Sequence, residues 1–124
     1  MGLLSRMLGH ASEADIGSVE ETLEHVLAEG EKVEKAFQLM RDLIIFTSHR
    51  MILIDRQGVT GRKAEYHSVP YRAVTHFTVE SAGTFDLEAE LKIWLAGTPD
   101  PIQKTFSRGK TIFDVQRALA TYVR

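Results

Sequence analysis

The chain has 124 residues, 44% hydrophobic and 26% charged, and this length and composition fit one folded domain rather than two independent ones. The formal net charge of −2 disfavours nucleic-acid partners, because such proteins need a strongly basic face to neutralise phosphates. The sequence has no cysteine, which excludes disulfides, thiolate metal sites and cysteine nucleophiles.

The first thirty residues differ in pattern from the rest, and we expect a helical extension over residues 1–30 followed by the main domain over residues 31–124. Met1 to Leu8 is apolar but too short for a membrane span of about 20 residues. The same segment lacks the cleavage site of a signal peptide. Cytoplasmic residence is therefore predicted.

Ser18 and Glu21 have the spacing of a capping box, in which each side chain satisfies a backbone amide of the other residue. Apolar residues follow at helical spacing, so a helix is predicted from about Val19 to Leu27. Gly30 is the predicted stop signal.

From residue 31 onward apolar residues recur with a period of two, which is typical of half-buried strands. The clearest strand runs from Phe85 to Leu95, with one apolar face and one acidic face that only Trp94 interrupts. Six weaker segments also predict strands, namely Val33 to Leu39, Leu43 to Thr47, Arg50 to Asp55, Arg62 to Val69, Val74 to Glu80 and Ile102 to Phe106. Pro70 has no amide hydrogen, so it is expected at a strand end or a sheet edge.

The last segment is an amphipathic helix, in which Ile112, Val115 and Leu119 form one apolar stripe and Tyr122 extends it. Seven short strands followed by one such helix predict a mainly β domain. Its antiparallel sheet has to bend or roll in order to bury its apolar face, and the helix closes the open end.

Three stretches, Arg50 to Gly61, Tyr66 to Tyr71 and Phe77 to Trp94, resemble the bacterial pleckstrin-homology-like (PH-like) domain family. The resemblance covers roughly residues 31–124 and implies seven strands in a bent, partly open barrel with a C-terminal helix. It also implies ring-shaped homo-oligomers, pentamers among them, and no established enzymatic activity. Eukaryotic relatives often bind phosphoinositides through a basic loop between the first two strands. Here that connection is about Arg41-Asp42, without a lysine cluster, so lipid binding is not carried over.

The segment Arg108-Gly109-Lys110-Thr111 lies between the last predicted strand and the helix, where a phosphate-binding loop would lie. Such a loop needs a glycine five positions before Gly109, and Lys104 stands there, so nucleotide hydrolysis is not predicted. An anion at the start of the helix, beside Arg108 and Lys110, is the milder hypothesis. We favour a solvated turn in which Thr111 caps the helix.

No catalytic residue, metal site or cofactor is predicted. The five histidines show no helical pair of ligands, and no carboxylate joins them at a ligand spacing. Asp86, Glu88 and Glu90 share the solvent-exposed face of one strand. Acid–base catalysis requires two carboxyl groups whose proton affinities are separated by burial, and this face is not expected to provide it. A solvated face, or a complement to basic residues of a neighbouring subunit, is the favoured interpretation.

Two apolar features predict an interface. Trp94 interrupts a polar row, and tryptophan is enriched among binding hot spots. Leu43 to Phe46 are apolar in succession, so both faces of that strand need cover. The N-terminal helix and a second subunit are the two candidates for that cover; they are compatible, and we favour the subunit. The candidate oligomer interface consists of Leu43, Ile45, Phe46 and Trp94.

The function predicted from the sequence is a non-enzymatic interaction module that forms a homo-oligomer and binds an unidentified protein. The alternative is peripheral association with a lipid surface through Met1 to Leu8 and basic loops.

Overall fold

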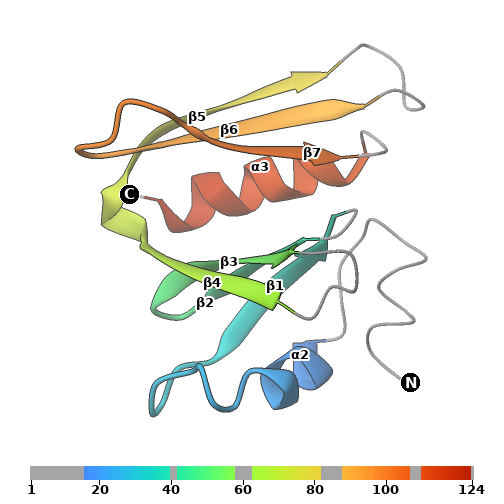
Figure 1. Ribbon diagram of the computed structural model, residues 1–124, viewed down its shortest axis with the longest axis vertical. Coiled ribbons are helices and arrows are strands. Elements are labelled where there is room, and N and C mark those ends of the chain that lie inside the picture. Colours follow the sequence, from blue (N-terminus) through green and yellow to red (C-terminus); the bar gives the residue numbers. More distant parts are fainter. Residues whose placement is uncertain (1–15, 40–41, 58–62, 82–87, 107–109, 124) are drawn as a thin grey trace. The chain divides into compact units, whose positions relative to one another are not determined.

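The computed structural model describes residues 16–39, 42–57, 63–81, 88–106 and 110–123 (Figure 1). Its strands form two antiparallel sheets, and the element bounds are α2 Ile16–Thr22, β1 Val33–Gln38, β2 Leu43–Thr47, β3 Arg50–Gln57, β4 Lys63–Pro70, the 3-10 turn Tyr71–Ala73, β5 Val74–Ser81, β6 Ala89–Leu95, β7 Ile102–Phe106 and α3 Lys110–Tyr122. The mainly β fold with a C-terminal helix is confirmed. The chain divides at Val69 into two units, each with its own sheet.

The N-terminal unit is a four-stranded sheet in the order β1-β2-β3-β4, so each strand pairs with the next strand along the chain. The register places Ala36 opposite Ile45 and Ile45 opposite Ile52, which gives one continuous apolar face. Val19 and Leu23 belong to the same buried cluster as these residues. The helix α2 and the turn that follows it therefore pack against the four-stranded sheet, as Figure 1 shows.

The helix α2 differs from the prediction at both ends. It begins at Ile16, so Ser18 lies inside the helix and the predicted capping box is not its start. It ends at Thr22, because the following residues form a tighter turn in which the Val26 amide donates to the Leu23 carbonyl at 2.7 Å. Gly30, with φ of 83°, occupies the turn before β1 rather than the helix end.

The strands β2 and β3 form a hairpin, with Ser48 and His49 as its two-residue connection. No non-glycine residue in the described ranges has a positive φ, which excludes the type I′ turn that such hairpins favour. The Thr47 hydroxyl takes over part of the turn's hydrogen bonding. It accepts from the amides of His49 and Arg50 at 3.0 and 2.9 Å.

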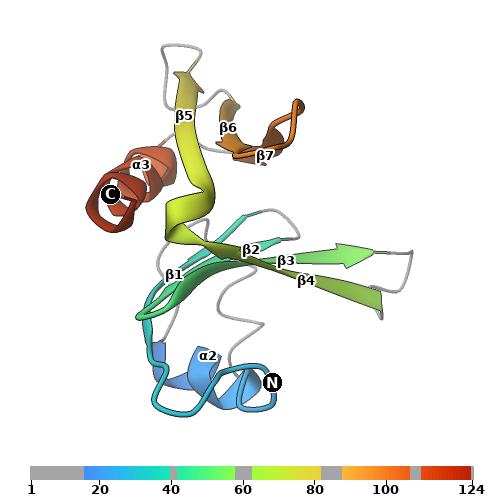
Figure 2. The ribbon, with the colours of Figure 1, turned by 90° about the vertical axis from the view of Figure 1, so that its left-hand side faces the viewer.

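The C-terminal unit is a three-stranded sheet in the order β5-β6-β7, with α3 running beside it and contacting β6 (Figures 1 and 2). The predicted stripe of α3 is confirmed, since Ile112, Val115 and Leu119 are fully buried. The alternation predicted for the longest strand holds over Ala89, Leu91 and Ile93, which are buried, and Leu95, which is half-buried. Phe85 and Leu87 lie outside the described residues.

The prediction for Pro70 is confirmed. Pro70 is the last residue of β4, and β4 is the outermost strand of its sheet, as a residue without an amide hydrogen requires. The turn between β6 and β7 contains Gly97 with φ of 82°, a conformation that glycine adopts without strain. In the described ranges, no helix combines the length and the apolar character needed to cross a membrane.

Candidate functional site

One face of the β5-β6-β7 sheet carries polar and aromatic side chains, and it is the candidate site. The register sets His76 opposite Trp94, Thr78 opposite Lys92 and Glu80 opposite Glu90. Because side chains two positions apart share a face, these three cross-strand pairs form one surface. The apolar residues Leu91 and Ile93 point to the other face and are fully buried.

Trp94 is held in a defined orientation on this surface. Its ring stacks on His76 with centroids 4.5 Å apart and planes 12° from parallel. The Thr75 hydroxyl donates to the Trp94 carbonyl at 3.2 Å, which adds to the pairing of β5 with β6. The tryptophan is half-buried, and the prediction that it interrupts the polar row is confirmed by its register.

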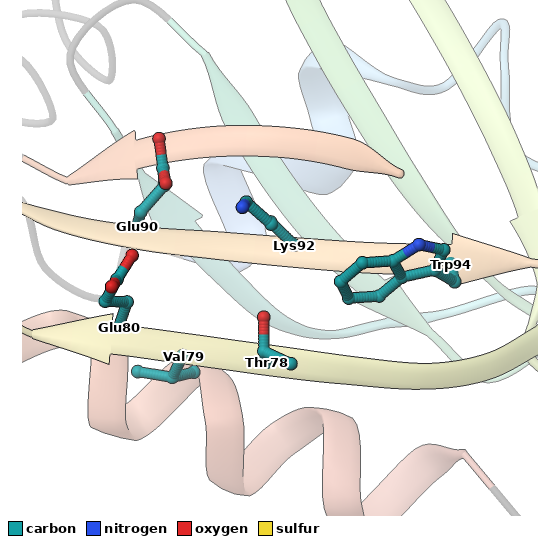
Figure 3. A pocket seen from close by; sticks show the side chains of 6 residues that line it. All are labelled: Thr78, Val79, Glu80, Glu90, Lys92 and Trp94. Atoms are coloured by element: carbon teal, nitrogen blue, oxygen red, sulfur yellow. The ribbon is translucent and has the colours of Figure 1, made fainter. Parts of the chain in front are cut away.

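The same surface is hollowed. An open depression of about 420 Å³ is lined by Thr78, Val79, Glu80, Glu90, Lys92 and Trp94, and we call it the β5–β6 hollow. Figure 3 shows Glu80 and Glu90 on neighbouring strands at one end, Trp94 at the other, and Thr78 with Lys92 between them. Gln103 of β7 donates to the Glu90 carboxylate at 3.0 Å.

The candidate interface residues on β2 are buried within the chain itself. Leu43 is 7% exposed, and Ile45 and Phe46 are fully buried. Leu43 and Ile45 belong to the cluster that contains Val19, so the N-terminal segment covers that face of β2. Phe46 packs edge-on against Phe37, with ring centroids 6.1 Å apart. Of the four predicted interface residues, Trp94 alone remains accessible.

The predicted anion segment lies mostly outside the described residues, since Arg108 and Gly109 are not among them. The helix α3 begins at Lys110, which makes Thr111 its second residue. Thr111 is 7% exposed. Thr111 therefore lies inside the first turn rather than at the cap position, and the solvated turn predicted before it lies outside the described residues.

The sequence analysis missed an ion pair between the buried Glu31 carboxylate and the half-buried Arg50 guanidinium. The guanidinium donates to both carboxylate oxygens at 2.9 Å, from Nε to Oε2 and from Nη2 to Oε1. It also donates from Nη2 to the Val26 carbonyl and from Nη1 to the Ser68 hydroxyl, both at 2.7 Å. The network therefore joins the turn after α2 to β3 and β4. No local pattern marks it, because its members come from distant parts of the sequence.

Arg50 controls the ionisation of Glu31. Its hydrogen bonds, assisted by those from Thr47 and the Ala28 amide, lower the pKa of the Glu31 carboxyl from 4.5 to about 2, against the opposing effect of burial. The same pairing raises the pKa of Arg50. Each group compensates the charge of the other and shares two hydrogen bonds with it, so we interpret the pair as a structural contact rather than a reactive centre.

The residues described contain no group of three or more histidine, aspartate or glutamate side chains placed to hold a metal ion. His67 and His76 lie on β4 and β5, which belong to different sheets and are not paired strands. Asp86 lies outside the described residues, Glu88 is exposed and Glu90 is half-buried.

Two sheets of four and three antiparallel strands followed by an amphipathic helix define a PH-like domain. Residues 2–123 match the model of the bacterial PH domain family, and the chain belongs to that family. The match includes most of the first thirty residues. The division of the chain into an extension over residues 1–30 and a domain over residues 31–124 stays a prediction.

The chain is 50% identical over 121 residues to the uncharacterized protein YjqA of Bacillus subtilis strain 168, and the alignment covers 97% of each chain. It is also similar to the crystal structure of a pleckstrin homology domain from Shewanella amazonensis SB2B, with a TM-score of 0.84, 46% identity and 98% of each chain covered. A PH-domain protein from Shewanella loihica PV-4 gives a TM-score of 0.78 and 42% identity over 91% of this chain and 97% of that one. Neither the family description nor these names indicate catalysis.

Proposed function

We propose that the chain is a non-enzymatic PH-like interaction module that self-associates into a ring-like homo-oligomer and presents a protein-binding surface. A ring of five copies is the size expected from the family resemblance. The cytoplasm is the compartment in which we expect it to act.

The observation that carries the self-association is the open edge of β4. This strand ends the order β1-β2-β3-β4, so it has a paired neighbour in its sheet on one side only. Lys63 to Tyr66 are exposed in succession, and Tyr66 is 48% exposed. An unpaired edge presents amides and carbonyls that add a strand from another chain. Pairing between two different edges of identical chains is a head-to-tail contact, which closes into a ring when the rotation between successive copies divides a full turn.

Size-exclusion chromatography with light scattering, followed by native mass spectrometry, tests the assembly. We expect one defined oligomer at tens of micromolar, and a monomer under those conditions would refute the proposal. Tyr66→Lys should disrupt the oligomer, because a lysine on an edge strand opposes edge pairing. Phe113→Lys on α3 is the matched control, since Phe113 is 49% exposed, and it should leave the oligomer intact. An oligomer that survives Tyr66→Lys assembles through another surface.

The lipid alternative depends on Met1 to Leu8 and on basic loops such as the one that contains Arg62, and these residues lie outside the described ranges. No observation on the described residues favours it, so it is not proposed. Co-sedimentation of the full chain with anionic vesicles provides the check, and we expect the protein to stay in the supernatant.

A further inference from the structure

We propose that the β5–β6 hollow binds an extended segment of a partner protein by taking up one lysine or arginine side chain. The proposal rests on the protein-binding half of the proposed function, and it specifies the chemistry that this surface recognises.

Among the described residues, no cation is paired with the acidic end of the hollow. Glu80 lies directly opposite Glu90. Like charges that face each other across two strands destabilise a sheet. Gln103 donates to Glu90, yet no described residue forms an ion pair with either carboxylate. A cation supplied from outside would relieve this repulsion, so its binding should be favourable at this end.

The other end suits the remainder of a basic side chain. Trp94 offers an indole surface that its stacking on His76 holds in place. Lysine and arginine are attracted to tryptophan rings through cation–π contacts, and their aliphatic stems cover apolar surface. A side chain or short segment that spans the hollow can therefore meet both the carboxylates and the indole (Figure 3).

The balance of charge selects a cation over an anion. Two carboxylates and one ammonium line the hollow, which leaves one negative charge in excess. Lys92 lies opposite Thr78 and forms no ion pair with a described residue, so its ammonium does not cancel the pair of carboxylates at close range. It should instead repel an incoming basic group, which makes its removal informative.

The size and openness of the hollow favour a peptide segment. Its volume of about 420 Å³ falls within the range of about 300–1,000 Å³ that small ligands occupy. It is a depression on a sheet surface, bounded by strands that run side by side. An extended chain can lie along such a surface while one of its side chains enters the depression.

The test is a titration of the full chain with the blocked peptide acetyl-Val-Arg-Val-amide. The protein has a single tryptophan, so its indole N–H signal in the NMR spectrum reports on the hollow without ambiguity. We expect a saturable shift of that signal. The peptide in which neutral citrulline replaces arginine should bind at least tenfold more weakly, and equal binding of the two would overturn the proposal.

Three variants separate recognition from general effects. Glu80→Gln should weaken binding of the arginine peptide at least fivefold while raising the melting temperature by about 1–4 °C, because it removes the cross-strand repulsion. Lys92→Met should strengthen binding two- to fivefold. Glu21→Gln, an exposed glutamate of α2, is the control and should change neither value. Stronger binding of the arginine peptide by Glu80→Gln, together with weaker binding by Lys92→Met, would indicate an acidic partner and overturn the proposal.

Two further measurements show which of the two proposals a negative result contradicts. Methylguanidinium alone should bind far more weakly than the peptide, and equal affinity would mean a site for a free cation rather than a protein segment. Light scattering on the same samples reports the assembly separately. An oligomer that ignores the arginine peptide overturns the peptide site alone, whereas a monomer that binds it overturns the self-association alone.

Discussion

Arg50 provides the sharpest expectation for a single residue, because it satisfies a carboxylate whose side chain has no solvent exposure. Replacing it by methionine keeps the length of the side chain but leaves the buried Glu31 carboxylate without a cation, with only the Thr47 hydroxyl and the Ala28 amide as donors. We expect a loss of about 3–5 kcal/mol in the free energy of unfolding, measured by urea denaturation. The double variant Arg50→Met with Glu31→Gln should recover part of that loss, and a single variant as stable as the native chain would contradict the structural role.

Glu31 also predicts how stability depends on pH. Its pKa is about 2 in the folded chain and 4.5 in the absence of these contacts. A lowered pKa stabilises the folded state fully above the unfolded value, so this contribution is lost as the pH falls from about 4.5 towards 2. The difference corresponds to roughly 3 kcal/mol. Urea titrations at several pH values should show this fall in the native chain, and the corresponding component should be missing in Glu31→Gln.

At the scale of elements, the turn after α2 should behave as part of the core. Leu23 is 1% exposed and packs in the cluster of the four-stranded sheet. Leu23→Ala should lower the free energy of unfolding by about 2–4 kcal/mol, because it removes buried methyl groups and leaves a cavity. Ile16→Ala in α2 is the control, since Ile16 is exposed, and it should cost less than about 0.5 kcal/mol. Equal effects would mean that the segment is not anchored as described.

The elements that the sequence predicted best are those that local periodicity determines. β2 has the predicted bounds, and the stripe of α3 is buried as expected. The end of α2 was mispredicted because the residues after Thr22 form a tight turn instead of continuing the helix. Tertiary contacts hold this segment, since the Glu20 carboxylate accepts from the Val33 amide at 2.8 Å, thirteen positions away. Local propensity cannot register such a bond.

Only part of the candidate site could be predicted from the sequence, because the rest also depends on contacts between distant residues. Alternation placed Glu90, Lys92 and Trp94 on one face of a strand. The hollow depends on which residues of β5 stand opposite them, and a sequence pattern does not contain that register. The pairing of Glu80 with Glu90 and the stack of His76 on Trp94 are therefore visible only in the folded chain.

At the scale of the whole molecule, each unit has its own sheet and its own helix, and the family match spans both. The two sheets expose different features. The first ends in β4, with an open edge and mostly exposed side chains, and the second carries the β5–β6 hollow. Assembly and recognition are thus proposed for separate surfaces, which allows one to be altered without the other.

This separation predicts how the melting temperature depends on concentration. An oligomer that forms only from folded chains is stabilised by mass action, so its melting temperature rises as the protein concentration rises. We expect that rise for the native chain between about 5 and 500 micromolar and for Glu80→Gln, whose change lies in the hollow. Tyr66→Lys should melt at one temperature across the range, because its β4 edge no longer supports pairing. A native chain without concentration dependence, or a Tyr66→Lys variant that retains it, would show that the β4 edge is not the surface that stabilises the fold.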